Sequence, residues 1–82
     1  MKITVEIEYE SEALRTRIIG ILIDEDVRFL EGSKPRHKGF IGSNGETHVT
    51  CEFDHAYEAV KVLDKIEETV QDMQRKNKTQ GP

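Results

Sequence analysis

Three residues of types that bind metals or act as nucleophiles lie close together in the chain: His48, Cys51 and His55. Histidine nitrogen and cysteine sulfur are common zinc ligands, and a cysteine beside a histidine can attack a substrate. On an extended strand, however, residues three apart point to opposite faces, so His48 and Cys51 would diverge. We therefore expect Cys51 to be a small buried residue, and we expect no metal site here.

A second pair of reactive groups, Glu6 and Glu8, shares one face of a predicted strand. Paired carboxylates can perform acid–base catalysis when a pocket shifts their pKa values. Nothing in the sequence indicates such a pocket, and acids on an exposed face usually serve only to solvate the protein. We expect no catalytic residue, no cofactor and no enzymatic activity.

Basic residues gather in two places, one in a loop and one near the C-terminus, and each group could hold a phosphate backbone. The candidate RNA-contacting residues are Lys34, Arg36, Lys38, Arg75, Lys76 and Lys78. No aromatic residues for base stacking are interleaved with these charges, so ordinary solvated loop charge is the alternative interpretation.

The composition limits the size of the core and the kind of partner. With 82 residues the chain is expected to be one domain, and 35% apolar against 34% charged residues makes a thin core. A net charge of -4 does not attract nucleic acid over the whole molecule. A small domain of this kind is commonly stabilised by oligomerisation or by a partner. We therefore expect a protein partner.

The single cysteine cannot form an internal disulfide, which suits a reducing compartment. The sequence opens directly into a strand pattern without the apolar segment of a signal peptide. Its longest apolar run, Ile18–Ile23, is too short to cross a bilayer. These features predict a cytoplasmic protein without a membrane contact.

A long helix is predicted from Asp54 to Lys76, with Asp54 as its N-cap. Apolar residues recur there at alternating gaps of three and four, which forms one stripe: Ala56, Ala59, Leu63, Ile66, Val70 and Met73. Residues 77–82 are polar and without pattern, so the domain is expected to cover 1–76 and a disordered tail 77–82.

The first half of the chain predicts a strand and then a helix. Ile3–Tyr9 alternates apolar and polar residues, as a half-buried strand does. Ser11 is a possible N-cap for a helix that continues through Ile18–Ile23. That run is β-branched and contains a glycine, so a buried strand is the alternative. The capped amphipathic spacing favours the helix.

A hairpin is predicted around Asn44-Gly45, the preferred pair for a type I′ turn. Its strands would be 36–42 and 47–53, with Phe40 opposite Val49 and Lys38 opposite Cys51. Val27–Leu30 would form only a short extended piece before a loop. The predicted order is thus β-α-β-β-α, an α+β fold in two layers with a three-stranded antiparallel sheet and two helices on one face.

This layout resembles the small dimerisation subunit of the KEOPS complex, a family that includes the cancer/testis-antigen relatives (CTAG-like family). The resemblance lies in the strand Ile3–Tyr9, the capped helix opening Ser11–Leu14, the hairpin at Asn44–Glu46 and the passage Thr47–Asp54 into the last helix. Ala56–Leu63 departs from the leucine/arginine opening usual in the family, which suits a divergent paralogue.

The resemblance implies an accessory subunit without catalytic activity of its own. Members of the family pair through their sheets, and their helices dock on the large transferase subunit that makes threonylcarbamoyl-adenosine in tRNA. The partners expected from the resemblance are therefore a second copy or a paralogue, the transferase subunit, and tRNA if RNA is contacted directly. A small stand-alone RNA-binding domain, which would use the two basic groups, is the alternative.

Overall fold

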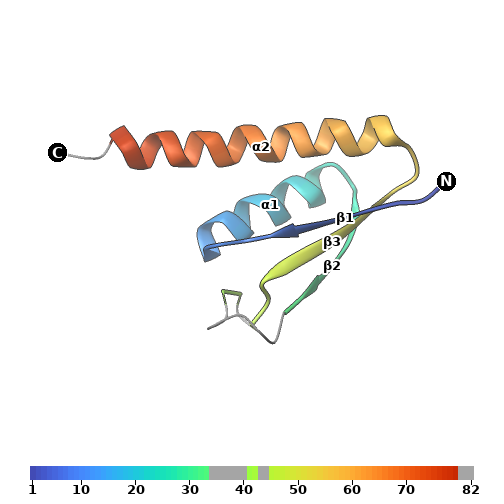
Figure 1. The fold of residues 1–82 in the computed structure, drawn as a ribbon, viewed down its shortest axis with the longest axis horizontal. Helices are drawn as coiled ribbons and strands as arrows, with labels where there is room; N and C mark the ends of the chain where they lie inside the picture. The colour runs from blue at the N-terminus through green and yellow to red at the C-terminus, as the bar shows by residue number, and fades with distance from the viewer. Residues whose placement is uncertain (34–40, 43–44, 80–82) are drawn as a thin grey trace.

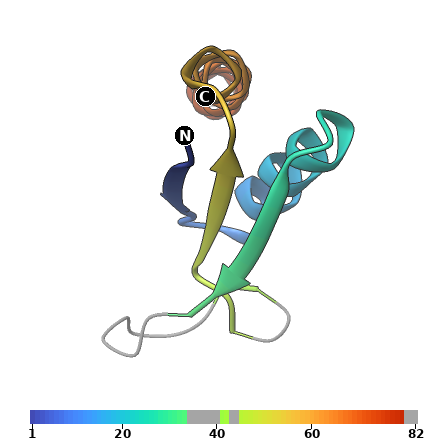
Figure 2. The same ribbon diagram turned by 90° about the vertical axis from the view of Figure 1, so that its right-hand side faces the viewer.

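The computed structural model describes residues 1–33, 41–42 and 45–79, with the backbone alone for 76–79. Its elements are β1 (Ile3–Glu8), α1 (Glu12–Asp24), β2 (Arg28–Gly32), β3 (His48–Phe53) and α2 (Ala56–Thr79). The strands form one antiparallel sheet in the order β1-β3-β2. Both helices lie on the same side of this sheet (Figures 1 and 2). The predicted two-layer α+β fold is confirmed.

Strand β1 has the alternation that its sequence predicts. Ile3, Val5 and Ile7 are half-buried and face the helices, whereas the residues between them are exposed. Each residue pairs with the central strand in a regular antiparallel register, from Ile3 opposite Phe53 to Glu8 opposite His48. Val49, Cys51 and Phe53 are buried on the helix side of β3, which confirms the predicted burial of Cys51.

Helix α1 begins at the predicted cap, where the Ser11 hydroxyl accepts a hydrogen bond from the Leu14 N–H at 3.1 Å. The run Ile18–Ile23 is helical, because Ile18 and Leu22 are then one turn apart and both become buried. The helix ends with Asp26 in the left-handed region at φ 58°. The Asp26 and Val27 N–H groups bond back to the Ile23 and Leu22 carbonyls at 3.1 and 2.9 Å, a Schellman ending.

The first strand of the predicted hairpin was wrong, because another segment occupies its place beside β3. Arg28–Gly32 pairs with β3, with Phe29 opposite Cys51 and Glu31 opposite Val49. Of the predicted strand 36–42, residues 36–40 lie outside the described part of the chain, and residues 41–42 are not in a strand. The predicted positive φ at Gly45 is present, at 87°, and the other residue of the predicted turn lies outside the description.

Helix α2 begins at Ala56, so the position before it belongs to His55 rather than to the predicted cap Asp54. The His55 carbonyl accepts from the Glu58 and Ala59 N–H groups at 3.2 and 3.4 Å. The helix continues to Thr79, three residues beyond the predicted domain boundary at 76. None of the described helices is long and apolar enough to span a membrane.

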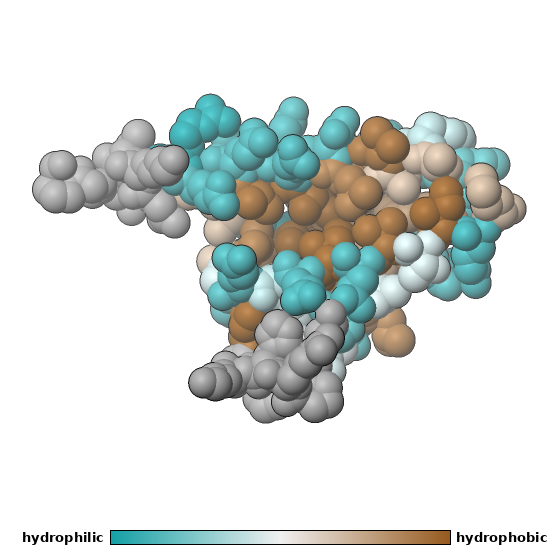
Figure 3. Space-filling view, in the orientation of Figure 1, coloured by the Kyte–Doolittle hydropathy of each residue, from teal (hydrophilic) through white to brown (hydrophobic). Residues whose placement is uncertain are grey.

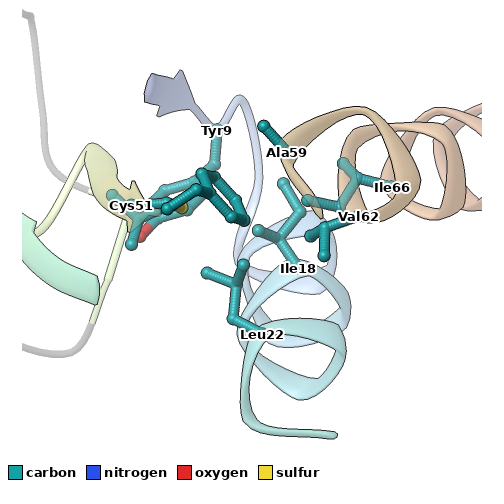
Figure 4. Close-up of a cluster of buried hydrophobic side chains, with 9 residues drawn as sticks. Tyr9, Ile18, Leu22, Cys51, Ala59, Val62 and Ile66 are labelled. Atoms are coloured by element: carbon teal, nitrogen blue, oxygen red, sulfur yellow. The ribbon is translucent and has the colours of Figure 1, made fainter. Parts of the chain in front are cut away.

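The core lies between the sheet and the two antiparallel helices (Figure 4). Its buried apolar residues are Tyr9, Ile18, Leu22, Val49, Cys51, Phe53, Ala59, Val62 and Ile66. Two residues of α2 differ from the predicted stripe: Ala56 is exposed and Val62 is buried. Val62 lies on the side of the helix that faces α1, so the buried stripe is rotated toward that neighbour.

Candidate functional site

The face of the sheet that is turned away from the helices is polar. Its outward residues are Thr4, Glu6 and Glu8 on β1, His48, Thr50 and Glu52 on β3, and Arg28, Leu30 and Gly32 on β2. Lys2 forms an ion pair with Glu52 at 3.1 Å, and the His48 ring lies 3.9 Å from the Glu6 carboxylate. RNA-binding sheets present aromatic residues for stacking, whereas this face carries glutamates. Among the described residues, this face therefore presents no aromatic side chain for base stacking.

The residues that could bind metal or attack a substrate are separated by the sheet. Cys51 is fully buried on the helix side, and burial raises the pKa of its thiol. His48 is on the opposite face, and the exposed His55 stacks on Tyr57 with 5.3 Å between ring centroids. A search of the described residues gives no group of three potential metal ligands. The buried thiol is poorly suited to nucleophilic chemistry.

A partly buried polar cluster joins α1, β2 and Tyr9, the residue after β1, at one end of the sheet. Arg15 donates two hydrogen bonds to Glu31, at 2.7 and 3.0 Å, and a third to Glu12 at 3.1 Å. The Tyr9 hydroxyl also donates to Glu31, at 3.2 Å. Burial, and then the neighbouring Glu31 carboxylate, raise the pKa of Tyr9. A two-pronged Arg–carboxylate contact of this kind fixes geometry, so we assign the cluster a structural role.

Sequence reasoning missed this cluster because it placed Glu31 in a loop. Arg15 and Tyr9 lie 16 and 22 positions before Glu31 in the sequence, so no local sequence pattern connects them with it. Near the cluster, Gly42 lies against the side chains of Glu46 and Arg15, so a Cβ at this position would require the flexible Glu46 side chain to shift.

A hollow of about 400 Å³ lies at the end of the molecule where α2 begins. Charges of both signs line it, and two of its cations are held by neighbouring acids: Lys2 by Glu52 at 3.1 Å and Lys61 by Glu25 at 3.7 Å. Lys65 also donates to Glu25, which lowers the pKa of that carboxyl. The pairs of Glu25 with Lys61 and Lys65 join the end of α1 to α2.

An apolar strip runs along the edge of the sheet between β1 and α2, and it is open to solvent. Figure 3 shows it as a continuous brown band beneath α2. It is formed by half-buried side chains on two elements: Ile3, Val5, Ile7, Leu63 and Val70. We call this the β1–α2 strip. In the described part of the chain, no further strand pairs with the outer edge of β1.

The strip arises because α2 leans toward α1. Lys65 contacts Glu25 at the end of α1, and Thr69 lines a shallow hollow with Thr16 and Gly20 of α1. At 100° per residue, Leu63 and Val70 lie on the side of α2 turned away from these contacts. Figure 2 shows α1 and β1 on opposite sides of α2. The helix layer therefore leaves the inner face of β1 half covered, which the apolar pattern alone did not predict.

The predicted RNA-contacting residues are only partly described. Lys34, Arg36 and Lys38 lie outside the described residues, and of Lys76 and Lys78 only the helical backbone is described. The Arg75 guanidinium lies 3.4 Å from the Asp72 carboxylate, one turn earlier on α2. RNA contact through these residues stays a prediction.

Comparison of the chain with protein-family models, with curated proteins and with solved structures gave no match. The candidate site therefore depends on the geometry of the molecule, in which the β1–α2 strip is an apolar surface that the described residues leave partly uncovered.

Proposed function

We propose that this chain is a non-catalytic accessory subunit that acts by docking to other proteins. We further propose that it serves a tRNA threonylcarbamoyl-adenosine modification assembly, in the manner of the small dimerisation subunit that its sequence resembles. The β-α-β-β-α order and the one-sided helix layer support this proposal, since they are the layout that the resemblance implies.

The observation that carries the docking function is the β1–α2 strip. Five aliphatic side chains line it, and they are only half-buried in the single chain (Figure 3). Contiguous apolar surface next to an unpaired strand edge commonly marks a protein interface, because covering it removes that surface from water. A partner that supplies a strand and an apolar face would complete both layers of the fold.

The remaining surfaces support binding rather than chemistry. The thiol of Cys51 is buried in the core, and two of the acids lining the end hollow, Glu52 and Glu25, form ion pairs with lysines. Catalysis by side chains requires a nucleophile or base that substrate can reach, with a neighbouring group that shifts its pKa. An accessory role fits this arrangement better than an enzymatic one.

The test is reconstitution with the large ATP-binding transferase subunit of the same organism. We expect the two proteins to co-elute, and we expect tRNA modification by the transferase to rise when this chain is added. The chain alone should modify no tRNA. Absence of any association with the transferase, at concentrations of tens of micromolar, would contradict the proposal.

A matched pair of variants locates the docking surface. Ile23 on α1 and Leu30 on β2 are both apolar and exposed, at 65% and 76%, but they lie on opposite sides of the sheet. If the helices contact the transferase, Ile23→Glu weakens the association at least about tenfold, which corresponds to about 1.4 kcal/mol. Leu30→Glu should then leave the association unchanged.

A further inference from the structure

We propose that the face of the sheet turned away from the helices binds an extended acidic peptide from a partner protein. Arg28 holds a carboxylate of the peptide, and Leu30 covers an aliphatic side chain two positions further along it. The inference goes beyond the proposed function, because it assigns a second partner, distinct from the transferase, to the side opposite α1 and α2. In the described ranges 1–33, 41–42 and 45–79, no helix or strand covers this face (Figures 1 and 2).

A hollow of about 300 Å³ on this face is built by residues of all three strands. The strand register places Thr4, Glu52 and Arg28 in one row across the sheet, and Thr50 and Leu30 in the next row. Threonine side chains are shorter than those of the arginine, leucine and glutamate beside them, so the face is hollowed between the longer side chains. The volume is at the lower end of the range for ligand sites, so it suits one or two side chains of a peptide.

Arg28 supplies the hollow with a cation that has no hydrogen bond or ion pair in the described part of the chain. It lies opposite Glu52 in the sheet, but the Glu52 carboxylate pairs with Lys2 at 3.1 Å from the β1 side. The Arg28 side chain is also exposed. A guanidinium presents a planar set of N–H donors that matches the two oxygens of a carboxylate. The ligand group that complements Arg28 is therefore a carboxylate.

The two threonines and Leu30 add further contacts for such a ligand. The hydroxyls of Thr4 and Thr50 make no hydrogen bond within the described residues, so both can donate to a carboxylate or a peptide carbonyl. Leu30 is 76% exposed, and an aliphatic side chain packed on it would remove apolar surface from water. Arg28 and Leu30 are two residues apart on β2, a spacing of about 6.5 Å that same-face side chains of an extended peptide share.

The acids on the same face limit how much negative charge the ligand can carry. Glu6 and Glu8 of β1 share this face with the hollow, and Glu52 lines it. A polyanion such as an RNA backbone would be repelled by these carboxylates. A single carboxylate placed over β2 is further from those of β1, because β3 lies between the two strands. The favoured ligand therefore has one acidic residue, with an aliphatic residue at the second position after it.

The first experiment is an NMR titration of the 15N-labelled full chain with the peptide acetyl-Gly-Glu-Ser-Leu-Gly-amide. We expect saturable shifts of the Arg28, Leu30 and Thr50 amides with a Kd of about 1 mM or tighter. The amides of Ile18 and Ile66, in the two helices, should not shift. Peptides with glutamine or lysine in place of the glutamate should bind at least about fivefold more weakly, because they lack the carboxylate that Arg28 recognises.

The second experiment repeats the titration with variants of the chain. Arg28→Gln should weaken binding of the glutamate peptide at least about fivefold, because the charged donor is lost. Arg17→Gln is the matched control: it lowers the net charge equally, at an exposed position of α1, and should leave binding unchanged. Leu30→Ser should weaken binding at least about threefold through the lost apolar contact. Circular dichroism checks that each variant is folded.

Several results would overturn the inference. These are the absence of saturable shifts at about 5 mM peptide, equal binding of the glutamate and glutamine peptides, and equal effects of Arg28→Gln and Arg17→Gln. Sodium acetate that gives the same shifts at the same concentration would show only a contact with small anions. Shifts of these amides by tRNA but not by the peptide would assign the face to RNA. Transferase association is measured separately and should not change in Arg28→Gln, so this inference and the proposed function fail independently.

Discussion

At the scale of single residues, Arg15 connects distant parts of the described chain, because it joins α1 to β2 through hydrogen bonds to Glu31. Its guanidinium donates two hydrogen bonds to Glu31 and one to Glu12, and the Tyr9 hydroxyl donates to the Glu31 carboxylate as well. Both Arg15 and Glu31 are largely buried, so their charges depend on each other for solvation.

We expect Arg15→Met to lower the free energy of unfolding by about 2 kcal/mol, because Glu31 would lose its charged donor in a poorly solvated place. Urea denaturation at neutral pH measures the change. Arg17→Met is the matched control on the exposed side of the same helix, where the effect should stay within about 0.5 kcal/mol. Equal effects for the two variants would contradict the assigned role of Arg15.

Cys51 offers a second test at this scale. Its side chain is fully buried, and burial raises the pKa of the thiol, so the thiolate that reacts is scarce at neutral pH. We expect an aromatic disulfide reagent to label the folded protein at least about a hundredfold more slowly than the protein in urea. Rapid labelling under native conditions would show that the thiol reaches solvent.

Sequence reasoning predicted single residues well where periodicity governs burial. Cys51 and Ile66, which the strand and helix patterns placed on apolar faces, are buried as expected. It missed Val62 and misplaced Ala56, because the position of α1 beside α2 decides which side of the long helix is covered. That position depends on side-chain packing between elements far apart in the sequence.

At the scale of the element, the end of α1 is followed by a residue, Asp26, whose backbone conformation is unusual for a residue other than glycine. Asp26 adopts φ 58°, a conformation that glycine reaches without strain and that is costly for residues with a Cβ. The backbone bonds from Asp26 and Val27 to the last turn nevertheless require it. The acidic run Asp24–Asp26 therefore coincides with a specific backbone ending of the helix.

We expect Asp26→Gly to raise the free energy of unfolding by about 0.5–1 kcal/mol, because the strain disappears and the Schellman bonds remain. Thermal denaturation measures the gain. Asp24→Gly is the matched control, since Asp24 is the last residue of the helix proper and glycine weakens a helix there. A loss of stability for Asp26→Gly would contradict this account of the helix end.

The hairpin shows where local signals fail. The Asn-Gly pair correctly indicated a positive φ at Gly45. Because of that pair, however, the strand was predicted at 36–42, directly before the turn. The strand is instead Arg28–Gly32, whose five residues show little alternation. Phe29 and Glu31 are held there by pairing with β3 and by Arg15, contacts that no short window of sequence contains.

At the scale of the whole molecule, the small core makes each buried side chain important. A chain of 82 residues has a free energy of unfolding of about 4–12 kcal/mol by the usual scaling. The predicted layout was correct at this scale because five capped or patterned elements have few ways to cover one sheet. The lean of α2 toward α1, and hence the β1–α2 strip, could not be predicted from element order.

We expect Leu22→Ala to lower the free energy of unfolding by about 2–5 kcal/mol, because Leu22 is fully buried between α1, α2 and the sheet. A fraction of that variant should be unfolded at 37 °C, which circular dichroism would detect. Leu30→Ala, at 76% exposure, is the control and should change stability by less than about 0.5 kcal/mol.

The central place of β3 also governs how the chain can assemble during translation. β1 and β2 both hydrogen-bond to residues 48–53 and not to each other, so neither can join a sheet before that segment leaves the ribosome. Because translation adds about 5–20 residues per second, Ile18 and Leu22 of the nascent α1 stay exposed to solvent for seconds before β3 has been synthesised. Ribosome-bound chaperones would meet this protein as an exposed helix and a lone strand, and folding would finish only after α2 is released.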